Sequence, residues 1–133
     1  VMRKFGVTGG TDITGFGLFG HAHKMAKASK VDIDIYSTRI PYIKETYKLV
    51  EEGCIPGAGF RNEEYVGCNL HMYSSDYNCK MICFDAQTSG GLLFGIDEAY
   101  VDEAITMLKS FGLTYTSVIG KVKPSGNGQI NFY

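Results

Sequence analysis

The sequence predicts an α+β fold of the α/β type, in which a mixed, largely antiparallel sheet is covered by helices. Segments with an apolar stripe at helical spacing alternate with short segments rich in β-branched and aromatic residues. Glycines cluster at 6–20, 53–59, 90–95 and 120–128 and separate these segments. Turn-forming residues at 124–128 join two late strand-like segments, which predicts an antiparallel hairpin.

Three segments have the pattern of an amphipathic helix. In 14–29 the apolar side chains fall at i, i+4, i+7 and i+8. A second helix is expected over 41–53, where proline opens the segment and glycine ends it, and a third over 97–111. Residues 61–66 fit one short helical turn.

Five segments are expected to be strands. Residues 31–36 alternate apolar and polar side chains with period two, which is typical of a half-buried strand. Residues 80–84, 91–96, 114–122 and 129–133 are rich in apolar, β-branched or aromatic side chains.

Length and charge restrict the class of protein. The 133 residues fit one domain, expected to span 1–133. A net charge of −1 argues against a nucleic-acid-binding protein. The longest apolar runs, such as 92–96, are too short to cross a membrane, and no secretory signal is visible. We therefore expect a cytoplasmic protein with no nucleic-acid or membrane partner. The sequence begins with Val1, has Met2 only in second place, and starts as if within a helix or strand. We therefore expect a fragment of a longer protein.

The four cysteines are Cys54, Cys68, Cys79 and Cys83, and their wide, irregular spacing contains no CxxC pair. That spacing argues against a zinc ribbon. If 80–84 is a strand, Cys79 and Cys83 lie on one face and provide only two ligands. Buried free thiols in a reducing compartment are the expected state.

Residues 9–21 (GGTDITGFGLFGH) form the first tract that core packing does not explain. Its acidic residue, Asp12, lies in a Gly/Thr-rich approach to a helix start, where backbone N–H groups and the helix dipole favour anions. A carboxylate there is suited to holding Mg²⁺ against phosphate oxygens. The alternative is that Asp12, Thr11 or Thr14 only caps the helix and that the glycines only permit close packing.

Residues 85–93 (DAQTSGGLL) form the second tract, in which two hydroxyls and a double glycine precede an apolar strand. This pattern fits an anion-binding nest. It fits equally well a structural turn in which Thr88 and Ser89 bond the local backbone. It is neither a Walker A loop nor a dinucleotide-binding fingerprint.

Together these tracts resemble the C-terminal domain of selenophosphate synthetase (selenide, water dikinase). The resemblance rests on TDITGFGLFGH at 11–21 and DAQTSGGLL at 85–93. Between them, GCIPGAG at 53–59 and Arg61-Asn62 resemble the family's Gly-x-x-Pro-Gly-Gly loop and the Arg-Asn that follows it. The matches occur in the family's order and cover most of the chain. The implied fold is that of the C-terminal domain of aminoimidazole ribonucleotide synthetase-type enzymes.

The resemblance implies an enzyme that converts ATP, selenide and water to selenophosphate, AMP and phosphate. The family's metal-binding aspartate matches Asp12, which implies that Asp12 helps to hold Mg²⁺ against the phosphates of the substrate ATP. The resemblance places seven further residues near the nucleotide: Thr11, Thr14, Gly15, Gly17, Thr88, Ser89 and Gly90.

The family's N-terminal half, with its catalytic cysteine or selenocysteine, lysine and further aspartates, has no match here. We therefore assign no catalytic residue to this chain and expect the isolated chain not to hydrolyse ATP. Implied partners are that N-terminal domain and, in the full-length enzyme, a second copy. His21 is expected to have a structural role. Arg61 is expected to be an exposed loop residue, with contact to a phosphate as the alternative.

Two alternatives remain. One is a sister enzyme with this architecture: aminoimidazole ribonucleotide synthetase, thiamine-monophosphate kinase or a hydrogenase-maturation protein. The other is a freestanding, non-catalytic binding module.

Overall fold

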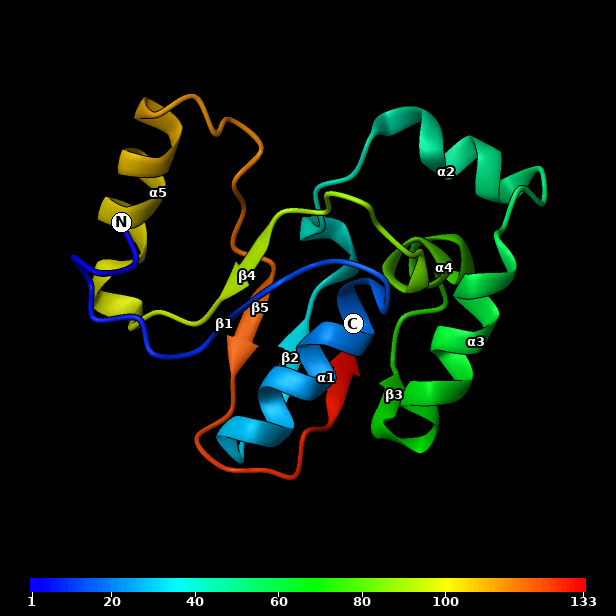
Figure 1. Ribbon diagram of the computed structural model, residues 1–133, viewed down its shortest axis with the longest axis horizontal. Coiled ribbons are helices and arrows are strands. Elements are labelled where there is room, and N and C mark those ends of the chain that lie inside the picture. Colours follow the sequence, from blue (N-terminus) through cyan, green and yellow to red (C-terminus); the bar gives the residue numbers. More distant parts are fainter.

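A four-stranded mixed sheet, covered on one face by helix α1 (Gly17–Ser29), forms the centre of the molecule (Figure 1). The computed structural model describes residues 1–133. The strand order is β3–β6–β2–β5. The strands are β2 (Ile33–Ile35), β3 (Leu70–Met72), β5 (Gly120–Val122) and β6 (Ile130–Phe132). β6 is parallel to both β2 and β3, whereas β5 is antiparallel to β2. The predicted α+β class with a mixed sheet is confirmed, but two of the three strand pairs in this sheet are parallel, so the sheet is not largely antiparallel.

The predicted late hairpin is wrong, because β2 lies between β5 and β6. The connection between them is held by the Asp32 carboxylate, whose Oδ1 accepts from the backbone N–H of Asn127 at 2.9 Å and of Gln129 at 2.7 Å. The Lys123 N–H also donates to the Asp32 carbonyl. These bonds hold the β5–β6 connection against Asp32, just before the start of β2. As a result, β6 pairs with β2 on the side opposite to β5.

A separate two-stranded ribbon joins β1 (Gly10–Asp12) to β4 (Leu92–Phe94) in antiparallel register. Gly10 pairs with Phe94 and Asp12 pairs with Leu92. The ribbon therefore brings the two sequence tracts side by side.

Four further helices complete the fold. They are α2 (Lys44–Glu51), α3 (Gly57–Val66), α4 (Tyr77–Phe84) and α5 (Val101–Ser110). Helices α1, α3 and α4 pack on one another, and α2 packs on α4. Helix α5 lies apart from them, next to the N-terminal segment (Figure 1). There Lys4 is 2.6 Å from Glu103, and the rings of Phe5 and Tyr100 are 5.6 Å apart.

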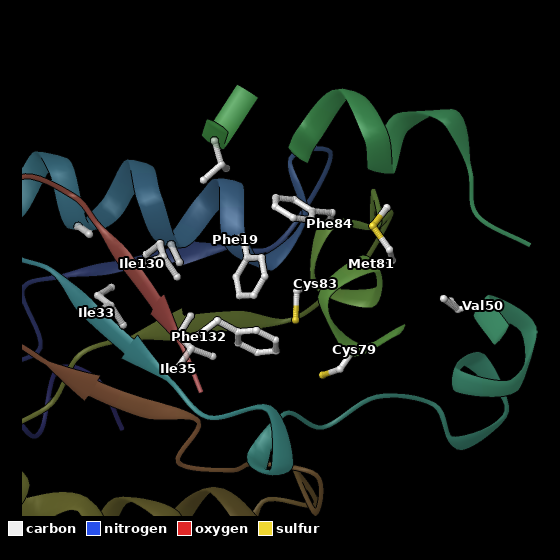
Figure 2. Close-up of a cluster of buried hydrophobic side chains, with 13 residues drawn as sticks. Phe19, Ile33, Ile35, Val50, Cys79, Met81, Cys83, Phe84, Ile130 and Phe132 are labelled. Atoms are coloured by element: carbon white, nitrogen blue, oxygen red, sulfur yellow. The ribbon is translucent and has the colours of Figure 1, made fainter. Parts of the chain in front are cut away.

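The core lies where α1 and α4 meet the sheet (Figure 2). The fully buried ring of Phe19 on α1 is T-shaped to Phe84 at 5.1 Å and to Phe132 at 5.0 Å. Such edge-to-face packing favours aromatic pairs beyond their buried area. Ile33, Ile35 and Ile130 complete the sheet side of this core.

The segment predicted as a strand at 80–84 is the second half of helix α4. Asp76 caps this helix by accepting from the Cys79 N–H at 2.9 Å. Helix α4 is buried on several sides, so its sequence has no clear amphipathic period that separates helix from strand. As a consequence, Cys79 and Cys83 are one helical turn apart and are both buried.

Several boundaries also differ from expectation. Helix α1 begins at Gly17 and α2 at Lys44, each about three residues late, and no side chain caps either helix. The short turn expected at 61–66 is the end of the longer helix α3. Helix α5 begins at Val101 after a 3₁₀ turn, and only 120–122 of the expected strand 114–122 pairs with the sheet.

Candidate functional site

Backbone hydrogen bonds hold the two tracts together beyond the β1–β4 ribbon. The Ile13 N–H donates to the Gly91 carbonyl at 2.9 Å, and the Gly90 N–H donates to the Ile13 carbonyl at 3.1 Å. The Gln87 N–H then donates to the Thr14 carbonyl at 3.1 Å. These bonds join residues more than seventy positions apart in sequence, so the two tracts form one continuous structure.

Asp12 is the last residue of β1, and its side chain is exposed. Its carbonyl accepts from the Thr11 hydroxyl at 3.1 Å, but its carboxylate takes part in none of the five salt bridges of the chain. The carboxylate is near enough to His21 to favour the charged form of that imidazole. Asp12 therefore presents a free carboxylate just before the helix start, and it does not cap α1.

His21 holds the loop between β1 and α1. Its Nε2 lies 3.0 Å from the Thr14 hydroxyl and accepts from the Phe16 N–H at 3.4 Å. Because Nε2 accepts, the ring is neutral with its proton on Nδ1. Burial lowers the pKa of His21, Asp12 opposes this shift and Lys24 adds to it. A neutral, buried imidazole fits the structural role expected for His21.

The glycines of this loop have different environments. At Gly17 the backbone φ is +67°, and a Cβ would lie 2.7 Å from the Cys83 carbonyl oxygen. At Gly15 a Cβ would meet nothing within 4 Å. Gly17 is therefore required for the close approach of α1 to the end of α4, whereas Gly15 leaves the exposed side of the loop open.

Asn62 joins this loop to the third matched segment. Its side-chain amide donates to the Gly15 carbonyl at 2.9 Å and to the Phe84 carbonyl at 2.9 Å. The residue is only 6% exposed. The sequence analysis did not predict this role, although Asn62 belongs to the matched Arg-Asn pair. A local pattern does not show that a side chain will bond carbonyl groups from two distant segments. Arg61 beside it is exposed, as expected, but it lies in helix α3 and not in a loop.

In the second tract Thr88 and Ser89 are exposed, and neither hydroxyl makes a hydrogen bond within the chain. The loop that carries them closes through the Gln87 and Gly90 bonds to Thr14 and Ile13. A Cβ at Gly90 would lie 2.7 Å from the Ile13 carbonyl oxygen, so only glycine fits there without a shift. Thr88 and Ser89 thus project from a loop fixed onto the first tract.

The model of the family described as "AIR synthase related protein, C-terminal domain" matches residues 1–132. The chain belongs to this family.

Curated relatives of this AIR synthase-related domain are named selenide, water dikinase. One from Porphyromonas gingivalis is 44% identical over 122 residues, which cover 90% of this chain and 34% of that protein. One from Clostridioides difficile is 38% identical over 130 residues, covering 97% of this chain and 37% of the relative. A third, from Caldanaerobacter subterraneus, is 37% identical over 123 residues, which cover 92% of this chain and 36% of that protein. The chain spans about a third of the length of these relatives, and its similarity to selenophosphate synthetase is confirmed.

This AIR synthase-related domain has no cluster of three or more His, Cys, Asp or Glu side chains arranged to hold a metal ion. Asp12 is a single carboxylate, and the acidic residue of the second tract, Asp85, is bonded to Gln87 and has its pKa raised by burial. Neither Asp12 nor Asp85 lines the two hollows found next to Tyr42 and next to Tyr100. Residues of this domain therefore fit Mg²⁺ only as one part of a shared site.

None of the helices combines the length and the apolar character needed to cross a bilayer.

Proposed function

We propose that this chain is the C-terminal domain of an ATP-dependent selenophosphate synthetase. The reaction of that enzyme converts ATP, selenide and water to selenophosphate, AMP and phosphate. The family match, together with relatives named selenide, water dikinase, supports the proposal. The similarity to these relatives favours this enzyme over the sister enzymes that share the architecture, and over a freestanding binding module.

One observation carries the proposed role of the domain. Asp12 presents an unpaired, exposed carboxylate at the end of β1, directly before a loop that α3 and the second tract hold in place. Because hydrogen bonds hold the neighbouring backbone, little backbone freedom is lost when this carboxylate binds a ligand, which suits a site that another domain completes.

We propose that Asp12 is one ligand of a Mg²⁺ ion at the junction with the N-terminal domain. Magnesium in ATP-using enzymes is commonly held by one or two carboxylates together with substrate phosphates, so a single carboxylate from this domain is sufficient. When bound, the ion neutralises charge on the phosphate oxygens. The exposed hydroxyls of Thr88 and Ser89 are placed on the attached loop, where we expect them to face the phosphates with Thr11 and Thr14.

The remaining glycines of the site have supporting roles in this proposal. Gly15 leaves the loop open to a ligand, while Gly17 and Gly90 allow the close backbone contacts that fix it. We assign no catalytic side chain to this domain, and we propose that the catalytic residues belong to the N-terminal domain of a two-domain, homodimeric cytoplasmic enzyme.

The decisive experiment uses the full-length enzyme that carries this domain, with the substitution Asp12→Asn. ³¹P NMR measures AMP, phosphate and selenophosphate formed from ATP and selenide over a range of Mg²⁺ concentrations. Loss of an electrostatic contact to the reacting phosphates is expected to lower the rate by about 100-fold or more. The Mg²⁺ concentration needed for half-maximal rate should rise as well.

Asp102→Asn is the matched control, because Asp102 is an exposed aspartate on α5, apart from the two tracts. It should leave both quantities unchanged. A full rate in Asp12→Asn, with an unchanged Mg²⁺ requirement, excludes the proposed role of Asp12. Substantial Mg²⁺-dependent ATP hydrolysis by the isolated 133-residue chain contradicts the absence of catalytic residues from it.

A further inference from the structure

We infer that a second binding site lies in the crevice beyond the carboxyl ends of β2 and β3, and that it takes a small zwitterion of the amino-acid class. The crevice has a volume of about 540 Å³, which is within the usual range for small-molecule sites. Asp12 and the two tracts do not line it, so this inference does not depend on the proposed function.

The position of the crevice follows from the parallel part of the sheet. β2, β6 and β3 all end at one edge, where the chain leaves β2 through Ser37 and leaves β3 through Ser74. The Ser37 N–H donates to the Tyr133 carbonyl at 2.7 Å, and the Ser74 N–H donates to the Phe132 carbonyl at 2.9 Å. The segments that follow β2 and β3 both contribute residues to the crevice, namely Ser37 and Asp76, so it lies beyond this edge of the sheet.

One wall of the crevice is aromatic and includes a negative charge. The rings of Tyr42 and Tyr47 are stacked 6.2 Å apart, at an interplanar angle of 23°. The Tyr47 hydroxyl donates to Asp76 Oδ1 at 3.0 Å, and the Cys79 N–H donates to the same oxygen at 2.9 Å. The second oxygen of Asp76, Oδ2, has no partner within the chain, so it is available to an amino group.

The opposite charge is supplied by Lys44. Lys44 is exposed, is one of the residues that line the crevice, and takes part in none of the five salt bridges of the chain. By contrast, Lys48, one turn further along α2, lies 3.7 Å from Glu52. Ser37 and Thr38, two residues with hydroxyl groups, also line the crevice.

These groups select for a ligand with two charges. A simple anion would be attracted by Lys44 but repelled by Asp76. A simple cation would be attracted by Asp76 but repelled by Lys44. A ligand with an anionic group and an amino group satisfies both side chains, and an attached ring or alkyl group can pack on Tyr42.

The test uses the full-length protein that carries this domain and three related probes. L-phenylalanine has both charges, whereas 3-phenylpropionate and phenethylamine each keep the ring and one charge. Ligand-observed saturation-transfer NMR titrations run to about 20 mM, because a small ligand in an open crevice gains only a few kcal/mol. We expect saturable binding of phenylalanine and at least about tenfold weaker binding of the other two probes.

Substitutions then locate the site. Lys44→Gln is expected to weaken phenylalanine binding at least about tenfold, and Asp76→Asn should do the same while its Oδ1 still accepts from Cys79. Lys48→Gln is the matched control and should bind as the wild type does. Asp12→Asn should also bind normally, which separates this site from the proposed metal site. Non-saturable binding, equal affinity for all three probes, or wild-type affinity in Lys44→Gln overturns the inference.

Discussion

The side-chain amide of Asn62 donates to the Gly15 carbonyl at 2.9 Å, and so ties helix α3 to the loop that presents Asp12. The same amide donates to the Phe84 carbonyl at the end of α4. One buried side chain thus fixes three segments relative to one another. The contact therefore holds the loop that directly follows Asp12.

Replacement of Asn62 by alanine should destabilise the domain by about 2–3 kcal/mol, because two hydrogen bonds are lost and a buried carbonyl is left unpaired. Urea unfolding followed by circular dichroism measures the change. Asn127→Ala is the matched control, since the Asn127 side chain is exposed and only its backbone N–H is bonded. Equal stability of the two variants would show that the Asn62 bonds contribute little.

The two glycines of the loop should respond differently to alanine. Gly17→Ala introduces a Cβ 2.7 Å from the Cys83 carbonyl oxygen at a φ of +67°. We expect a loss of at least about 2 kcal/mol in unfolding free energy, because neither backbone can move away without breaking packing. Gly15→Ala meets nothing within 4 Å and should cost less than about 1 kcal/mol. Thermal or urea unfolding of the two variants measures these changes. Similar losses of unfolding free energy at both positions would contradict the packing argument.

His21 should make stability depend on pH. Burial lowers the pKa of His21 from its usual value of 6.5 in the folded state. The unfolded chain therefore takes up this proton first as the pH falls. The contribution of His21 to stability is complete above about pH 6.5 and declines as the pH falls through 6.5 toward the lowered folded pKa.

Urea unfolding at about pH 7.5 and about pH 5.5 should show this decline, and His21→Gln should reduce it. NMR titration of the His21 ring measures the folded pKa directly. A folded pKa at or above 6.5 would contradict the effect of burial.

The cysteines should react in two groups. Cys54 and Cys68 are exposed, whereas Cys79 and Cys83 are buried in α4. Burial also raises the pKa of the Cys83 thiol, which disfavours the reactive thiolate. A chromogenic disulfide reagent should therefore titrate two of the four thiols rapidly in the native state and all four in denaturant. Rapid reaction of all four native thiols would show that α4 opens readily.

Much of the fold could be predicted where local pattern and packing agree. The stripe at 14–29 becomes α1, and the alternation at 31–36 becomes β2, because one face of each segment packs on the same core. The prediction failed at 80–84, because a short apolar run buried on several sides carries no period. It failed again at the late hairpin, where the carboxylate of Asp32 directs β6 to the far side of β2.

The sequence by itself determined the family of this domain and the two tracts, because glycine spacing and residue type are local properties of the chain. Only the tertiary structure decided that the tracts lie against each other, that Asn62 fixes them and that Asp12 faces solvent without a partner. The physical reason is that these contacts join residues from distant parts of the chain. Their geometry depends on how the helices and strands pack, which no local pattern encodes.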